Sequence, residues 1–266
     1  MDIKNYTETN RQAWNYVMPK HQKCMKEKWD EFFLKGNKIV QDSTALELLN
    51  NIGLRNKDII HLCCNNGVEL LSLKGLGANK CVGVDICDLA ISEARERAKK
   101  LNMDVEYIRS DVYDIEKEYY QSFDMVYISV GTLRWLPDIS KFFKLCNNLL
   151  RSNGYIFIYD MHPLTEIVND DRYVDKDPLL IIKSYFNNDV YSDENGLDYI
   201  GHTNEKGKLK YWFIHNLSDI FNEIFKNKLN VKFFKEYEKD ISNVYSLIES
   251  QKVKIPLSYA LIAQKQ

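Results

Sequence analysis

Long apolar runs, a signal peptide, internal repeats and low-complexity tracts are all missing from this sequence of 266 residues. Every apolar run is far shorter than the roughly 20 residues that a helix needs to span a bilayer. The N-terminal stretch MDIKNYTETNRQAW is polar and does not contain the apolar core of a secretory signal. We therefore expect a cytoplasmic protein that does not bind a membrane.

An excess of charge of one sign is also absent. The chain has 36 Lys and Arg residues against 38 Asp and Glu residues, which gives a formal net charge of −2. Such a balance provides no general attraction to nucleic acid. Hydrophobic residues make up 45% of the chain, which is enough for the core of one large domain. We expect a single domain, a monomer or homodimer, with no nucleic-acid partner.

The six cysteines include no Cys-x-x-Cys pair, a spacing typical of metal and redox sites. Most of them lie in or beside expected strands, where cysteine acts as a small apolar residue in a reduced compartment. His61, Cys63 and Cys64 together suggest a metal site. Neighbouring residues of a strand point to opposite faces, however, so the two cysteines do not converge easily on one ion. We expect no bound metal.

Apolar runs alternate with helical patterns through the first 160 residues. The runs CVGV and MVYI are apolar throughout, which is typical of parallel strands buried on both faces. This alternation predicts a doubly wound α/β fold. We expect strands at 58–63, 80–85, 104–108, 123–129 and 154–160, with helices at 7–34, 43–53, 67–76, 88–101 and 138–150. The helices at 43–53 and 88–101 are expected to begin at the capping residues Ser43 and Asp88.

The pattern changes after His162 and Pro163. The next residues are rich in Asp, Asn, Tyr and Gly, and alternating stretches at 179–186 and 197–203 predict short strands. A helix is expected at 216–228, opened by Asn216 and Ser218. Since no helix separates the two final strands, 230–237 and 256–263, we expect them to pair antiparallel.

The segment 58–85 carries the clearest sign of a ligand site. An apolar strand is followed by the loop CCNNG, a helix, a second strand and the single acid Asp85. A loop before a helix N-terminus lets a ligand approach the backbone. An acid that ends the second strand can accept hydrogen bonds from both hydroxyls of a ribose. These features predict a pocket for a nucleoside-bearing cofactor.

The loop has one glycine, Gly67, where nicotinamide enzymes have three that admit a pyrophosphate. A pyrophosphate would meet the side chains at positions 63 and 65. The loop therefore disfavours a dehydrogenase, and a ligand with a ribose and no phosphate fits better. S-adenosylmethionine is the commonest such ligand.

Further segments agree with that ligand: RSDVYD after the third strand, FDMVYISVG at the fourth, and LLRSNGYIFIYD leading into the fifth. Together with IIHLCCNNG, TLRWLPD, DMHP and IPLSYAL, they resemble a class I S-adenosylmethionine-dependent methyltransferase of a bacterial small-molecule type. With this resemblance, we expect a Rossmann-like, mostly parallel seven-stranded sheet with an antiparallel C-terminal strand. The single domain would consist of an N-terminal helical cap (1–53), a cofactor-binding core (54–163), a substrate-side insertion after strand five (164–211) and a C-terminal helix and strand pair (212–266).

The resemblance implies which residues contact the cofactor, and these residues follow the carboxyl ends of the strands. They are Cys63, Asn65 and Gly67 for the methionine half, Asp85 for the ribose, Ile86, Asp111 and Val112 for the adenine, and Ser129 and Val130 beneath the sulfonium. Tyr16, with Trp14, is a candidate for a lid over the cofactor. The product would be S-adenosylhomocysteine.

The cofactor loop departs from the family pattern. Where the family has Asp-x-Gly-x-Gly-x-Gly, this chain has His61, Cys63, Asn65 and Gly67. Asn tolerates left-handed backbone angles better than most residues, so Asn65 can replace a glycine. Cys63 is small but carries a Cβ, which leaves a non-catalytic or weakly binding family member as an alternative. His61 is expected to serve in packing.

Methyl transfer from a sulfonium requires alignment of the acceptor and, where the acceptor carries a proton, a base. His162 follows the fifth strand and His215 precedes the helix at 216, so both are candidates for that base. Each can equally hold a loop by hydrogen bonding. Tyr127 and Trp135 are candidates for the acceptor pocket, although aromatic residues after an apolar strand more often belong to the core.

The residues that follow the fourth strand bear on the acceptor. Enzymes that methylate exocyclic amines of bases or glutamine often have Asn-Pro-Pro-aromatic there, whereas this chain has SVGT at 129–132. That difference disfavours those acceptors. We expect a small-molecule acceptor methylated on an O, N or S atom, with an RNA methyltransferase as a further alternative.

Overall fold

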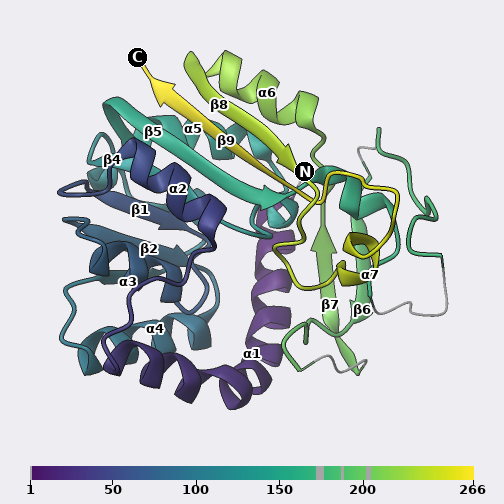
Figure 1. The fold of residues 1–266 in the computed structure, drawn as a ribbon, viewed down its shortest axis with the longest axis horizontal. Helices are drawn as coiled ribbons and strands as arrows, with labels where there is room; N and C mark the ends of the chain where they lie inside the picture. Colours follow the sequence, from purple (N-terminus) through teal and green to yellow (C-terminus); the bar gives the residue numbers. More distant parts are fainter. Residues whose placement is uncertain (1, 172–176, 187–188, 202–204) are drawn as a thin grey trace.

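The computed structural model describes residues 2–171, 177–186, 189–201 and 205–266. Within them, seven strands form one sheet in the order β3-β2-β1-β4-β5-β9-β8 (Figure 1). Five parallel strands come first: β1 (Ile59–Leu62), β2 (Cys81–Asp85), β3 (Glu106–Arg109), β4 (Phe123–Ile128) and β5 (Leu150–Met161). β9 (Ser258–Lys265) runs antiparallel to both β5 and β8 (Leu229–Tyr237). The predicted doubly wound fold with an antiparallel C-terminal strand is confirmed.

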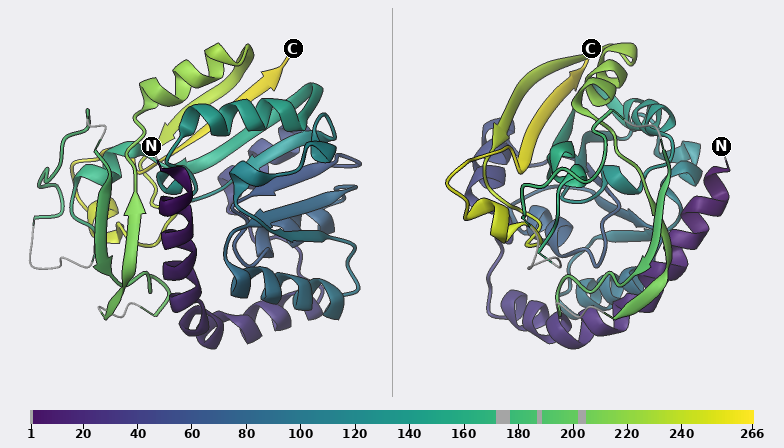
Figure 2. Two further views of the ribbon diagram at one scale, coloured as in Figure 1. Left: turned by 180° about the vertical axis from the view of Figure 1, so that it is seen from behind. Right: turned by 90° about the vertical axis from the view of Figure 1, so that its right-hand side faces the viewer.

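Helices cover both faces of the sheet, because successive strand residues point to opposite sides. On β1, Ile59 packs into the core on one face and Ile60 into the core on the other. The first face is covered by α2 (Ser43–Ile52), α3 (Val68–Gly75) and α4 (Asp88–Lys100), and the second by α5 (Ile139–Leu149) and α6 (Leu217–Lys226) (Figure 2). The short helices are η1 (Val112–Asp114), η2 (Lys117–Tyr119), η3 (Leu133–Trp135), η4 (Pro163–Ile167) and α7 (Ser246–Glu249). Among the helices of the described ranges, none combines the length and apolar character needed to cross a bilayer.

Two helices begin at residues that differ by one position from the prediction. The N-cap of α2 is Asp42, and Ser43 is already helical. The N-cap of α4 is Cys87, and Asp88 is the first helical residue. The carboxylate of Asp88 binds side chains of the N-terminal helix instead of capping its own. α6 begins after Asn216, as predicted, in a capping box.

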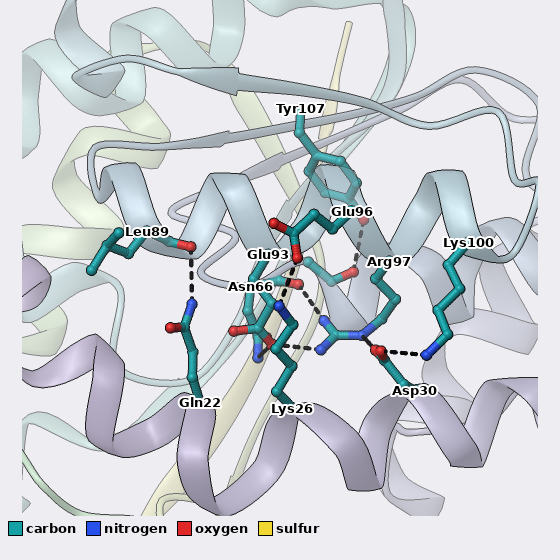
Figure 3. Close-up of polar contacts among 11 residues, drawn as sticks. Gln22, Lys26, Asp30, Asn66, Leu89, Glu93, Glu96, Arg97, Lys100 and Tyr107 are labelled. Atoms are coloured by element: carbon teal, nitrogen blue, oxygen red, sulfur yellow. Dashed lines mark hydrogen bonds and ion pairs between the residues drawn. The ribbon is translucent and has the colours of Figure 1, made fainter.

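The N-terminal helix α1 (Ile3–Leu34) reaches from the insertion to the far side of α4. Pro19 lies inside it, and proline removes a backbone hydrogen bond from a helix; Figure 1 shows that α1 bends between its two halves. The N-terminal half packs on β7 (Lys206–Trp212), where the Asn10 side chain exchanges hydrogen bonds of 2.8 and 2.7 Å with the backbone of Tyr211. The C-terminal half lies along α4 (Figure 3).

The short strands of the insertion lie elsewhere than the sequence pattern predicted. β6 (Tyr191–Asn195) pairs antiparallel with β7. The predicted strand at 179–186 is irregular, because Ile181 and Phe186 are exposed and no buried face holds the segment in register. The predicted strand at 197–203 is a turn as far as position 201, and its last two residues lie outside the described residues.

Candidate functional site

The loop between β1 and α3 turns through three residues in the left-handed region. The φ angles of Cys63, Asn65 and Gly67 are 57°, 49° and 73°. The tolerance of Asn65 for this conformation was predicted, whereas that of Cys63 was not, since cysteine is rarely left-handed. A Cβ on Gly67 would lie 2.5 Å from the ring of Tyr107, whose hydroxyl donates to the Gly67 carbonyl at 2.9 Å. The loop therefore keeps a glycine where both the conformation and the available space require one.

Asp85 closes this loop from the end of β2. Its Oδ2 accepts a hydrogen bond from the N–H of Asn65, and its Oδ1 accepts one from the N–H of Cys87, both at 2.8 Å. Burial raises the pKa of Asp85, and these N–H groups oppose the effect. Asp85 and Ile86 remain partly exposed. Because each carboxylate oxygen has a second lone pair, Asp85 can still accept hydrogen bonds from a ligand.

Asp111, which follows β3, lies beneath the start of α1. It caps η1 by accepting a hydrogen bond from the N–H of Tyr113 at 3.0 Å. Its Oδ2 accepts another from the hydroxyl of Thr7 at 2.7 Å and pairs with Lys4 at 3.3 Å. Asp111 and its neighbour Val112 are buried. The first turns of α1 therefore cover the place where the adenine contact was predicted.

Four polar side chains lie together beneath the loop. Nε2 of His61 lies 3.0 Å from Oγ of Ser129. The hydroxyl of Tyr127 donates to the carboxylate of Glu69 at 3.2 Å, and Ser129 lies close enough to Glu69 to favour its charged form. Nδ1 of His61 is buried without a hydrogen-bond partner in the described part of the chain. Because a buried N–H without an acceptor is the rarer arrangement, we assign the proton to Nε2, which donates to Ser129.

Glu69 is the residue of this site that sequence reasoning missed. It is the second residue of α3, directly after the loop, and its side chain is 29% exposed. Burial raises its pKa, while the hydroxyls of Ser129 and Tyr127 favour the carboxylate. The position at a helix N-terminus also favours negative charge. The available signal was an acid in the first turn of the helix that follows the loop.

We expect His61 to make the fold sensitive to acid. Full burial lowers its pKa from 6.5 to about 3, so the folded state holds the neutral imidazole. The unfolded chain therefore binds more protons, and stability present above pH 6.5 is lost as the pH falls toward 3. At about 1.4 kcal/mol for each pH unit between the two pKa values, the loss amounts to about 4–5 kcal/mol.

Urea unfolding at several pH values between 7 and 3 measures this loss. His61→Gln provides the control, because its amide can still donate to Ser129 but does not titrate. The free energy of unfolding of this variant should fall less steeply with acid than that of the wild type. Parallel curves would show that His61 is not the cause.

Aromatic side chains from three segments meet beside the loop. The ring of Trp14 on α1 lies 5.5 Å from that of Trp135 in η3 and 6.4 Å from that of Tyr199 in the insertion. The side chain of Asn65 in the loop lies close enough to the hydroxyl of Tyr199 to oppose the rise that burial causes in its pKa. Tyr16 lies about 200° around the helix from Trp14; it is 47% exposed, with Lys208 of β7 against its ring. Of the two predicted lid residues, Trp14 therefore faces the loop.

The two predicted histidines differ in what their ring nitrogens contact. Nδ1 of His162 accepts a hydrogen bond from the N–H of Leu164 at 3.0 Å, and its Nε2 lies 2.9 Å from Glu236. Nε2 of His215 lies 2.7 Å from the carbonyl oxygen of Leu136, a contact that requires a proton on Nε2. Burial lowers the pKa of both histidines. Nδ1 of His215 makes no hydrogen bond to any described residue, so it carries an available lone pair.

The loop after β4 is held by Asp160 at the end of β5. The Asp160 carboxylate accepts hydrogen bonds from the backbone N–H groups of Gly131 and Leu133. Burial raises the pKa of Asp160 to about 6. Ser129 is buried under this loop, whereas Val130 is 41% exposed. Asp160 thus fixes the segment that leads from Ser129 to the aromatic residue of η3.

Cys63 and Cys64 act as neutral thiols, because burial raises the pKa of both. Cys64 lies in the core, while Cys63 is partly exposed on the loop. Within the described ranges, no group of three or more His, Cys, Asp or Glu side chains is arranged to hold a metal ion.

Comparison with known proteins adds to this geometry. Residues 60–158 match a family model described as a methyltransferase domain. An uncharacterised protein of Methanocaldococcus jannaschii is 39% identical over 24% of this chain and 29% of its own length. The ubiquinone biosynthesis O-methyltransferase of Neisseria meningitidis is 29% identical over 39% of this chain and 44% of its own length. Other curated relatives are named N5-glutamine and ribosomal protein L11 methyltransferases. The matched part spans less than half of each relative.

A solved structure agrees with the fold over most of the chain. A putative S-adenosylmethionine-dependent methyltransferase from Listeria monocytogenes superposes with a TM-score of 0.62 at 18% identity. The superposition covers 85% of this chain and all of the other. At this identity the likeness establishes the fold.

Proposed function

Because this chain belongs to the class I S-adenosylmethionine-dependent methyltransferase family, we propose that it transfers a methyl group from S-adenosylmethionine to a small-molecule acceptor. The observation that carries the proposal is the loop after β1, with its three left-handed residues and the Asp85 carboxylate bound to its backbone. The open lone pairs of Asp85 suit a ribose, and the partly exposed carboxylate of Glu69 suits the ammonium group of a methionine. The donor set of this chain therefore fits the cofactor.

The cofactor, when bound, supplies an electrophilic methyl group on a sulfonium. Glu69 holds a negative charge beside the loop, where Ser129 and Tyr127 keep its carboxylate in place. It can thus take over the role of the family acid that His61 replaces. Trp14 and Tyr199 lie beside the loop and reduce the access of water to it, which would strengthen these electrostatic contacts.

A proton released by the acceptor needs a base, and His215 is the better of the two candidates. Its Nδ1 has an available lone pair, whereas both nitrogens of His162 are engaged with neighbouring residues. Lowering of its pKa by burial keeps the His215 imidazole neutral near pH 7, which is the form that accepts a proton.

The names of the curated relatives cover quinone, protein and ribosomal acceptors, so they do not select among acceptor classes. The aromatic residues of α1, η3 and the insertion cover part of the loop, and this favours a small acceptor. The near-neutral charge of the chain also disfavours RNA. We place the activity in the cytoplasm, in a monomer or homodimer.

Calorimetry with S-adenosylhomocysteine tests the donor half of this proposal. The wild type should bind, and Asp85→Asn should bind about 10- to 100-fold more weakly, because hydrogen bonds to a charged acceptor are worth about 1.5–3 kcal/mol. Asp104→Asn, which alters an exposed acid just before β3, is the matched control and should bind like the wild type. Absence of binding by the wild type would refute the proposal.

Incubation with methyl-labelled S-adenosylmethionine and a cell extract tests the acceptor half. The label should enter the low-mass metabolite fraction in a reaction that depends on the protein. Label in RNA or protein would instead support another acceptor class. Binding of S-adenosylhomocysteine without transfer to any fraction would favour a non-catalytic family member.

A further inference from the structure

We propose that the acceptor carries an anionic group, a carboxylate or a phosphate, which binds beside Arg134, Lys183 and Trp212. This inference rests on the proposed function, because it concerns the acceptor of the same site. Trp212 closes β7, at the side of the insertion that faces η3. Two buried hydrogen-bond donors are unsatisfied in this place, and an ammonium group lies beside them.

The two unsatisfied donors are the indole N–H of Trp212 and the Nε–H of Arg134. Both nitrogens are buried and have no acceptor among the described residues. Trp212 is 7% exposed, and the Arg134 guanidinium lies 6.0 Å from the centre of its ring. Buried N–H groups are almost always paired in folded proteins. Two unpaired donors this close together indicate a place for an acceptor atom that the chain does not supply.

Lys183 adds a positive charge beside these two donors. Its Nζ donates to the backbone carbonyl of Glu166 at 3.1 Å and makes no ion pair within the described ranges. It lies 5.2 Å from the ring centres of both Tyr191 and Trp212. Burial lowers its pKa, as expected for an ammonium group removed from water. An anion beside Lys183 would remove that penalty.

Three carboxylates, those of Glu166, Asp170 and Asp193, favour the charged form of Lys183. The Glu166 carboxylate is paired with Arg134 at 3.2 Å, and Asp193 is paired with the buried Lys210, which also lies near Trp212. Three cations therefore surround one indole ring, and two of them have carboxylate partners. The cations and the carboxylates are therefore equal in number, and the place for an anion is indicated by the two unpaired N–H groups.

A row of aromatic rings connects this cluster with the cofactor loop. The Arg134 guanidinium lies 5.3 Å from the ring of Trp135, which contacts Trp14. Trp14 contacts Tyr199, and Tyr199 lies beside Asn65 of the loop. An acceptor that lies along these rings would hold its anionic group at the cations and its reacting atom toward the loop. Its middle part would then be apolar or aromatic.

Indole NMR signals provide the test, because the chain has four tryptophans and each gives one N–H signal. In protein labelled with ¹⁵N-tryptophan, the signal missing from Trp212→Phe identifies Trp212. Succinate and inorganic phosphate are titrated separately at constant ionic strength. We expect a saturable downfield shift of the Trp212 indole proton, since its N–H gains an anionic acceptor. The signal of Trp29, in the C-terminal half of α1, should not move. The anion with the lower Kd indicates whether the acceptor carries a carboxylate or a phosphate.

Lys183→Met should weaken this binding at least about tenfold, the equivalent of one lost charge-assisted hydrogen bond. Lys235→Met is the matched control, because Lys235 also lies 5.2 Å from a tyrosine ring but is exposed on β8. Binding by the control should equal that of the wild type. If the spectrum of Lys183→Met shows loss of folding, Lys183→Gln replaces it. Absence of a shift in the wild type would overturn the proposal. An equal shift in the Lys183 variant would overturn it as well and would indicate an adventitious ion only.

Calorimetry with S-adenosylhomocysteine on the same sample separates this inference from the proposed function. Wild-type protein that binds S-adenosylhomocysteine but gives no Trp212 shift would refute the anionic acceptor and leave the methyltransferase function in place. Protein that shows the shift but does not bind S-adenosylhomocysteine would refute the proposed function and leave an anion site to be explained.

Discussion

Replacement of Gly67 by alanine is expected to abolish measurable binding of S-adenosylhomocysteine and to lower the free energy of unfolding by about 2–5 kcal/mol. The φ angle of Gly67 is 73°, which a Cβ disfavours by about 1–2 kcal/mol. The new Cβ would also lie 2.5 Å from the Tyr107 ring. Tyr107 is 4% exposed and its hydroxyl is tied to the Gly67 carbonyl, so the ring cannot move aside. The loop backbone must shift instead.

Gly36→Ala separates the two causes. Gly36 has a φ of 84° just after α1, and a Cβ there would meet no atom within 4 Å. This control carries the backbone penalty without the clash, so it should cost about 1–2 kcal/mol and leave binding unchanged. Urea unfolding and calorimetry measure both variants. Equal stabilities, or intact binding by Gly67→Ala, would mean that the loop does not depend on the space around Gly67.

Arg97→Met is expected to lower the free energy of unfolding by about 3–5 kcal/mol, because it leaves the buried Glu93 carboxylate without a cationic partner. Figure 3 shows Arg97 of α4 among its partners. Nε donates to Asp30 of α1 at 2.8 Å, Nη1 to the carbonyl of Asn66 at 3.0 Å, and Nη2 to Glu93. Arg97 and Glu93 are each 1% exposed. Since Asn66 belongs to the cofactor loop, the affinity for S-adenosylhomocysteine should fall as well.

The matched control for this variant is Arg151→Met. Arg151 also pairs with two carboxylates, those of Asp58 and Asp124, but its side chain is 42% exposed. Pairs that water can reach contribute about 0–1 kcal/mol, so this variant should unfold almost like the wild type. The double variant Arg97→Met, Glu93→Leu should recover part of the lost free energy of unfolding, because it also removes the unpaired carboxylate of Glu93. Equal costs for Arg97→Met and Arg151→Met would contradict the role of burial.

The parallel core could be predicted from the sequence because its signals are local. Apolar strands such as CVGV, the stop at Gly53 and the cap at Asn216 each lie within a few residues of the feature they determine. β7 could not be predicted in this way. Its sequence, KGKLKYW, has three lysines among seven residues, and the burial runs against the pattern, because Lys210 is buried and Leu209 is exposed. The strand is held by distant contacts with Asn10 and Tyr6 of α1. The segment at 179–186 has alternating apolar residues but pairs with no strand in the described part of the chain.

The same distinction applies to the site. The position of Asp85 at the end of a strand follows from the strand itself, and the left-handed conformation of Asn65 follows from its residue type. Glu69 could not be recognised, because its neighbours Ser129 and Tyr127 come from β4, about 60 residues away in the sequence. The orientation of Trp14 relative to Tyr16 likewise depends on which side of α1 packs against the rest of the chain.

The bend of α1 at Pro19 has a consequence for turnover. Thr7 closes over Asp111 and Trp14 closes beside the loop, so a nucleoside cannot reach or leave that carboxylate while the first half of the helix is seated. The second half of α1 is bound to α4 through the contact between Asp30 and Arg97. Under the proposed function, exchange of S-adenosylhomocysteine for S-adenosylmethionine would require the first half of α1 to move away from Asp111 at Pro19 while the second half stays packed on α4. We expect such a motion to limit the catalytic rate.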